Sequence, residues 1–179
     1  YKYSNTRGCC IKSIGYASLG SKTTGIRGVA VGLGALNGNT TGNNNTAVGK
    51  DALNDNTTAA NNTAVGYEAL SKNTTGTSLT AIGQLALAEN TTADDNTAIG
   101  RLALYTNTTG TQNVAVGAYA LCLNTNNYNT AVGYGSLKTN SSGQQNTAMG
   151  RDAGTANTSG SYNTLIGMQV SNSNTTGTC

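Results

Sequence analysis

The sequence predicts an all-β protein, a parallel β-solenoid of about ten 17-residue coils. Three observations carry this prediction: a glycine recurs every seventeen residues, a bulky apolar residue precedes it, and an asparagine follows almost every one at a fixed distance. A fixed period of this kind is the signature of a stacked repeat array. The repeated glycines, with one sixteen-residue step before Gly133, are Gly15, Gly32, Gly49, Gly66, Gly83, Gly100, Gly117, Gly133, Gly150 and Gly167.

The apolar residues of each repeat favour short strands. Ile, Val or Met stands directly before each glycine, and Leu stands four residues after it in eight successive repeats, from Leu19 to Leu137. Gly, Asn and Thr flank both positions, as they flank strands. A 34-residue helical repeat is excluded, because each helix would have to tolerate a glycine and an N-T-T-G turn. We therefore expect coils stacked about 4.8 Å apart, with two or three interior side chains each.

The repeats divide the chain into an N-terminal extension, residues 1–12, and a β-solenoid domain, residues 13–179. Solenoids usually carry a polar cap on their terminal coils, and the sequence contains no such segment. Uncovered strand edges recruit another chain, and a head-to-tail contact that does not close generates a filament. We therefore expect end-to-end association as one form of assembly.

Composition limits the partners. Only 9% of the residues are charged, against roughly 25% in an average soluble domain, but 36% are apolar and recur regularly, which argues against disorder. The net charge of +3 comes from scattered residues, so we expect no nucleic-acid partner. No apolar run is long enough for membrane insertion. The chain contains no histidine and no Cys/His cluster, so we expect no enzyme activity, catalytic residue, metal or cofactor.

An asparagine column follows the glycines by seven residues. In stacked parallel turns such side chains form an asparagine ladder, and the Gly or Ala three residues later suits a corner with positive φ. The alternative is N-glycosylation, because N-T-T, N-S-S and N-T-S are acceptor sequences. The residues concerned are Asn39, Asn56, Asn73, Asn90, Asn107, Asn140, Asn157 and Asn174.

The pair before each glycine indicates assembly. In Ala64-Val65 and its equivalents, neighbouring residues point to opposite faces of a strand, and both are apolar. One column fills the coil, which leaves the other for another chain. We expect a homo-oligomer, most simply a homotrimer with a shared axis; the alternative is a monomeric solenoid.

The repeat from Asn62 to Gly76, N-T-A-V-G-Y-E-A-L-S-K-N-T-T-G, resembles the repeats of phage and virus tail-fibre proteins. It is similar, more loosely, to the N-S-x-A-I-G repeats in the heads of trimeric autotransporter adhesins. The resemblance covers about residues 13–178. It implies a trimeric fibre or stalk for attachment, at a cell or virion surface.

The cysteines suggest crosslinks. Cys9 and Cys10 lie near one end of the chain and Cys179 at the other, so end-to-end stacking would bring them together. We expect interchain disulfides through these three residues and hence an oxidising, extracellular location. The alternative is that all the cysteines, including Cys122, are free.

The two positions after each glycine vary while their neighbours stay constant, so this column is a candidate ligand face. Tyrosine and charged side chains suit sugar binding, although drift at exposed positions gives the same pattern. The face consists of Tyr67, Glu68, Arg101, Tyr119, Tyr134 and Arg151.

The sequence thus favours a non-enzymatic extracellular fibre or filament, formed by lateral or end-to-end association. A receptor- or glycan-binding tail-fibre or adhesin head is the alternative. A third is ice binding, although the next outward residue after each threonine is bulky and apolar. The regular threonines on which it rests are Thr46, Thr63, Thr80, Thr97, Thr130, Thr147 and Thr164.

Overall fold

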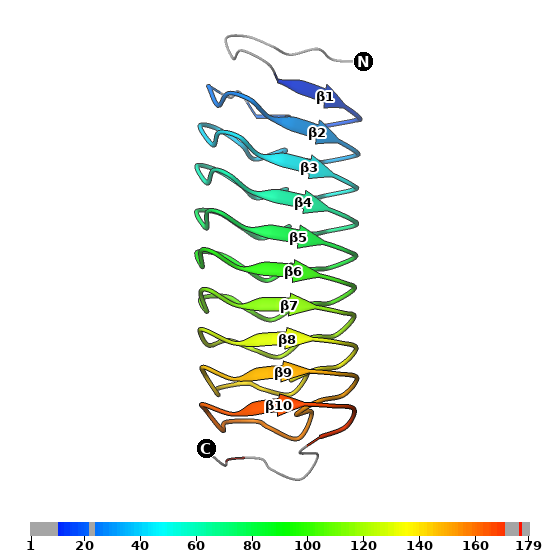
Figure 1. Cartoon of the computed structure of the whole chain (residues 1–179). Helices are drawn as coiled ribbons and strands as arrows, with labels where there is room; N and C mark the ends of the chain where they lie inside the picture. Colours follow the sequence, from blue (N-terminus) through cyan, green and yellow to red (C-terminus); the bar gives the residue numbers. More distant parts are fainter. Residues whose placement is uncertain (1–10, 22–23, 171–175, 177–179) are drawn as a thin grey trace.

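The structure, a computed structural model, describes residues 11–21, 24–170 and 176, and it confirms a parallel β-solenoid with 17-residue coils (Figure 1). Each described coil contributes one short strand to a single sheet whose strand order follows the chain. Ten strands about 4.8 Å apart extend over about 43 Å. The strands are β1 (Lys12–Ile14), β2 (Val29–Val31), β3 (Thr46–Val48), β4 (Thr63–Val65), β5 (Thr80–Ile82), β6 (Thr97–Ile99), β7 (Val114–Val116), β8 (Thr130–Val132), β9 (Thr147–Met149) and β10 (Thr164–Ile166).

Side-chain alternation in the strands separates the inside of the solenoid from the outside. In β4 the central Ala64 is fully buried, whereas Thr63 and Val65 point outward and are half-buried. Parallel pairing stacks like on like, with Ala64 beside Ala81 and Val65 beside Ile82. The prediction that the two apolar columns lie on opposite faces is therefore correct.

The interior of each coil holds more side chains than the sequence analysis predicts. The coil that begins at Gly49 buries six, because most are small; they are Ala52, Leu53, Asn56, Ala59, Asn62 and Ala64. The expected two or three per coil was too low. Of the two apolar anchors, only the leucine lies inside, since the residue before the glycine faces outward.

The leucine anchors do not form strands. Leu53 has φ +50° and Leu70 φ +52°, so both lie in the left-handed region within the turn that follows the strand. The Gly or Ala expected at positive φ does not adopt it: Gly76 is absent from the residues with positive φ, and Asn61 has φ +62° instead. Each left-handed leucine is held by its burial and by stacking, as in the hydrogen bond from the Leu70 amide to the Ala86 carbonyl, 3.0 Å.

The recurring glycine is required by the spacing between coils. Gly66 has φ +139°, and a Cβ atom there would lie 2.5 Å from the carbonyl oxygen of Gly83 in the next coil. Side chains rarely tolerate either condition. The glycine column therefore lets the chain turn out of the strand while adjacent backbones remain in contact.

Two buried asparagine ladders support the opposite side of each coil. In the predicted ladder, Asn73 Nδ2 donates to Asn56 Oδ1 (3.2 Å) and to the Gly76 carbonyl (2.9 Å). In the second, Asn45 Oδ1 accepts from the Asn62 amide at 3.0 Å, and Asn62 Nδ2 donates to the Gly76 carbonyl at 2.8 Å. Buried amides need such partners, so these ladders account for the Asn-rich repeat.

One coil is a residue shorter than the others. It begins at Gly117, and the residue is lost between Asn124 and Asn129, where other coils read N-T-T-G. Strand pairing continues across it, with Val114 beside Thr130, and so does the second ladder, in which the Asn129 amide donates to Asn113 Oδ1 at 2.9 Å. The first ladder is interrupted at Asn107, whose buried Oδ1 has no hydrogen-bond partner. The corner absorbs the deletion.

Candidate functional site

The outward side of the ten strands forms a continuous surface, here called the sheet face. It contains two columns, the first and third residues of every strand. Lys12 is the only charged residue within the ten strands that the structure describes. Ile82 and Ile99 are 39% and 38% exposed despite their apolar side chains. The third-residue column is Ile14, Val31, Val48, Val65, Ile82, Ile99, Val116, Val132, Met149 and Ile166.

The threonines of the sheet face differ from those of the corners. At the corner, Thr57 Oγ1 donates to the Thr74 carbonyl (3.1 Å) and Thr74 Oγ1 donates to the Thr91 carbonyl (3.0 Å), both in the next coil. Among the described residues, none of the seven sheet-face threonines donates a side-chain hydrogen bond to the protein; these are Thr46, Thr63, Thr80, Thr97, Thr130, Thr147 and Thr164. Their hydroxyls are available to an external partner.

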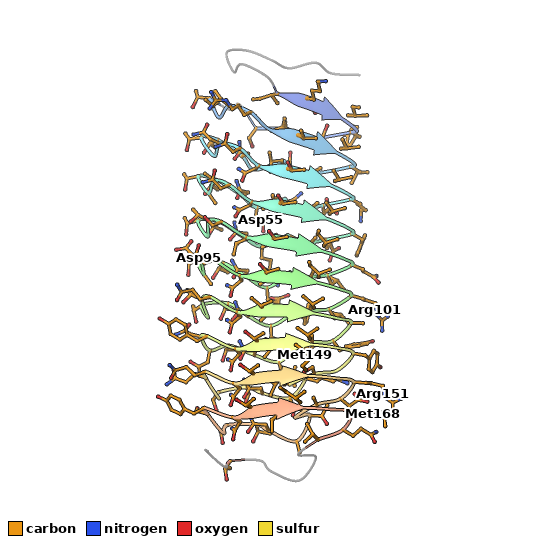
Figure 2. All side chains as sticks on the ribbon, in the orientation of Figure 1. Asp55, Asp95, Arg101, Met149, Arg151 and Met168 are labelled. Atoms are coloured by element: carbon orange, nitrogen blue, oxygen red, sulfur yellow. The ribbon has the colours of Figure 1, made fainter. Side chains whose placement is uncertain are left out.

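Several charged side chains project from the edges of the rod. Figure 2 shows Arg101 and Arg151 projecting from the edge where the strand arrows end, Asp95 from the opposite edge, and Met149 on strand β9. The sheet face is therefore bordered by polar groups on both sides. It is uniform along the rod, whereas the edges change from coil to coil.

Three of the six predicted ligand-face residues come together on one edge. The Arg101 guanidinium lies 4.7 Å from the centroid of the Tyr119 ring, and the Tyr134 ring meets Tyr119 edge to face at 5.8 Å. Lys138 Nζ lies 5.0 Å from the same Tyr119 centroid. These four residues, from three successive coils, are called the Tyr119 cluster.

Tyr67 and Glu68 lie in a different group, the Tyr67 cluster, with Lys50 and Asp51. Lys50 Nζ is 5.3 Å from the Tyr67 ring centroid and 3.3 Å from Asp51 Oδ2. A hydrogen bond to Asp51 is the main cause that raises the pKa of Lys50, and one to Glu68 is the main cause that raises the pKa of Tyr67. Each cation and hydroxyl in this cluster is thus already matched by a carboxylate.

Arg151 joins neither cluster and pairs with Asp152 at 3.6 Å. Lys138 was missed by sequence reasoning because it lies five residues after its glycine, outside the variable pair. Only the tight turn after the strand brings this position beside the next tyrosine, and nothing in the repeat pattern signals it.

The remaining candidate residues have different surroundings. Asn39, Asn56, Asn73, Asn90, Asn107, Asn140 and Asn157 are buried, so attachment of a glycan would require the coil to open. Asn174, Cys9, Cys10 and Cys179 lie outside the described residues. Cys122 is a free thiol, and its burial raises its pKa, which makes it a poor nucleophile at neutral pH.

No other feature of the described residues suggests a reaction centre. A shallow groove of about 360 Å³ is lined by Asp51, Asn54, Asp55, Glu68, Ser71 and Lys72. Within the part of the chain that the structure describes, no group of three or more His, Cys, Asp or Glu could hold a metal ion. Within the same residues, no helix is long and apolar enough to cross a membrane.

Comparison of the chain with protein-family models, with curated proteins and with solved structures finds no match. The architecture is therefore interpreted from its own geometry.

Proposed function

We propose that this protein is a non-enzymatic structural element, a rod that assembles laterally through its sheet face into an extracellular fibre for surface attachment. The observation that carries the proposal is the sheet face itself, an exposed apolar and threonine surface that runs the length of the rod with a single charge, at Lys12. Exposed apolar surfaces of this extent typically mark an interface.

Its dimensions favour a homotrimer over a dimer. Strands of three residues make the sheet face about 10 Å wide and 43 Å long, or about 430 Å². Stable complexes bury about 800 Å² on each partner, so a dimer through this surface alone would be weak. In a trimer each chain contacts two neighbours and can add the flanking columns. The resemblance to trimeric tail-fibre and adhesin repeats agrees with this arrangement.

Sedimentation of the wild-type chain and of two variants tests the proposal. Ile82→Glu places a carboxylate on the sheet face, where three copies would meet near the axis, and it should yield monomers. Gln84→Glu adds the same charge at an exposed position on the edge and should leave the trimer intact. A wild-type chain that sediments as a monomer at every concentration would refute assembly through this face.

Ice binding is the second candidate, because the hydroxyls of the sheet-face threonines donate no hydrogen bond to the described residues and stand in a regular array beside methyl groups. It requires the face to be open to water. A monomeric chain that shapes growing ice crystals, and that loses this effect in Thr80→Tyr but not in Thr74→Tyr, would support ice binding over fibre assembly.

A further inference from the structure

We infer that the Tyr119 cluster is a binding site for an acidic polysaccharide, one that carries a carboxylate or sulfate on its sugar rings. This inference does not depend on assembly through the sheet face, since the cluster lies on the edge of the rod and each chain carries all four of its residues.

The Tyr119 cluster carries two positive charges that no carboxylate neutralises within the described residues. Neither Arg101 nor Lys138 forms a salt bridge within the described residues, whereas Lys50, Lys72 and Arg151 each pair with a carboxylate. Both cations lie over one ring, Tyr119, at 4.7 Å for the Arg101 guanidinium and 5.0 Å for Lys138 Nζ. A guanidinium held against an aromatic ring keeps its N–H edges for an anion, and charge-assisted hydrogen bonds of this type are strong.

The Tyr134 side chain gives the cluster an apolar platform. The Tyr134 ring is 53% exposed and is held edge to face by Tyr119. An exposed, fixed tyrosine offers a flat surface with a polar tip, which suits the face of a sugar ring with its hydroxyls. Two cations beside such a platform select a saccharide that bears a negative charge.

The Tyr67 cluster also combines a cation with a tyrosine, but it contains two carboxylates as well. There, Asp51 and Glu68 satisfy Lys50 and Tyr67, so an anion would have to displace a carboxylate. The Tyr119 cluster contains no carboxylate. The inference therefore names one of the two clusters and excludes the other.

Binding to immobilised polysaccharides tests this inference. The probes are alginate for carboxylates, dextran sulfate for sulfates and uncharged dextran as the neutral comparison. The wild-type chain should bind at least one charged polymer, and should bind it more weakly as salt is added, because the contacts are partly electrostatic. No binding to either charged polymer, or equal binding to dextran, would overturn the inference.

Two double variants distinguish binding at the Tyr119 cluster from non-specific attraction between the positively charged chain and the polyanion. Arg101→Gln with Lys138→Gln should weaken binding about tenfold, which corresponds to about 1.4 kcal/mol. Lys72→Gln with Arg151→Gln removes the same charge from paired cations and should change binding less than about twofold. Equal losses in the two double variants would show that only net charge matters and would refute the site.

A tyrosine pair completes the test. Tyr134→Ala should weaken binding about fivefold, since it removes the platform, whereas Tyr162→Ala removes a ring of similar exposure, 55%, elsewhere and should not. Circular dichroism checks that all variants fold. Ile82→Glu, which tests assembly, leaves the four residues in place, so failure of the fibre proposal and failure of this site give different results.

Discussion

The corners and the sheet face use the same residue, threonine, in opposite ways. At the corners Thr57 and Thr74 bond to the next coil, and the asparagines beneath them do the same. On the sheet face Thr63 and Thr80 repeat just as regularly, but their hydroxyls donate no hydrogen bond to the residues that the structure describes. Coil stacking explains the repetition at the corners. Hydroxyl hydrogen bonds between coils do not explain the repetition of threonine on the sheet face. Two explanations are left there: the preference of Thr and Val for strands, and contact with a partner.

The largest effect should come from the glycine column, which ends each strand of the sheet face. Gly83→Ala should destabilise the chain by about 2 to 6 kcal/mol, because it combines positive-φ strain with overpacking. A Cβ atom there would lie 2.6 Å from the carbonyl carbon of Gly100. Urea unfolding measures the loss. Gly28→Ala is the matched control, since Gly28 has no positive φ and a Cβ atom there would meet nothing closer than 3.7 Å; equal losses would contradict the assignment.

The second-largest effect should come from the first asparagine ladder, at the corners. Asn73→Ala removes a side chain that joins Asn56, Asn90 and the Gly76 carbonyl, and should cost about 2 to 4 kcal/mol, since buried partners lose their hydrogen bonds. Asn107, at the interruption, bonds only to the Gly110 carbonyl at 2.8 Å. Asn107→Ala should therefore cost less, and thermal unfolding of the two variants compares them directly. A larger loss at Asn107 would show that ladder continuity is unimportant.

Replacing threonine by valine at a corner and on the sheet face tests whether the two sets of hydroxyls differ in their contribution to stability. Thr74→Val removes the hydrogen bond from the Thr74 hydroxyl to the Thr91 carbonyl, leaves the backbone bond to the same carbonyl, and should cost about 0.5 to 1.5 kcal/mol. Thr80→Val keeps the shape of a side chain that donates no such bond, so its effect should stay within about 0.5 kcal/mol. Denaturant titration of both variants decides. If Thr80→Val proved as costly, the sheet-face hydroxyls would have a role in folding after all.

The smallest effect should be at the exposed edge, where Lys72 Nζ lies 2.7 Å from Glu89 Oε2. This hydrogen bond is the main cause that raises the pKa of Lys72 above 10.5. The pair therefore stabilises the folded chain fully below pH 10.5, and this contribution is lost as the pH rises through the folded-state pKa of Lys72. Lys72→Met should lower the melting temperature only slightly at pH 7, and the difference from wild type should disappear above the folded-state pKa. A difference that persists there would assign the effect to packing.

The sequence predicts those features that depend on period, and the structure bears them out. The coil length, the strand before Gly66 and the ladder through Asn73 all follow from spacing, because stacking forces equivalent residues into contact. The left-handed Leu70 could not be predicted this way, since leucine rarely adopts positive φ and only burial in a stacked turn holds it there. The number of interior side chains was also underestimated, because alanine and asparagine fill the coil.

Of the two candidate sites, one could be predicted from the repeat period and the other could not. The sheet face could be expected from Ala64 and Val65 alternating across a strand. The Tyr119 cluster could not, since Arg101, Tyr119 and Lys138 occupy three different positions of the repeat and meet only through the turn geometry. Columns are visible in a sequence, but contacts between different columns depend on the path of the backbone.

The short coil has a consequence for how such a chain can diverge. A residue was lost between Asn124 and Asn129, yet β7 and β8 pair in the same phase as every other strand. The deletion at this corner is therefore accommodated without a change in the pairing of β7 with β8. A chain built on this plan can therefore tolerate a change of length at one corner, with the loss of a ladder hydrogen bond, while its sheet face stays straight.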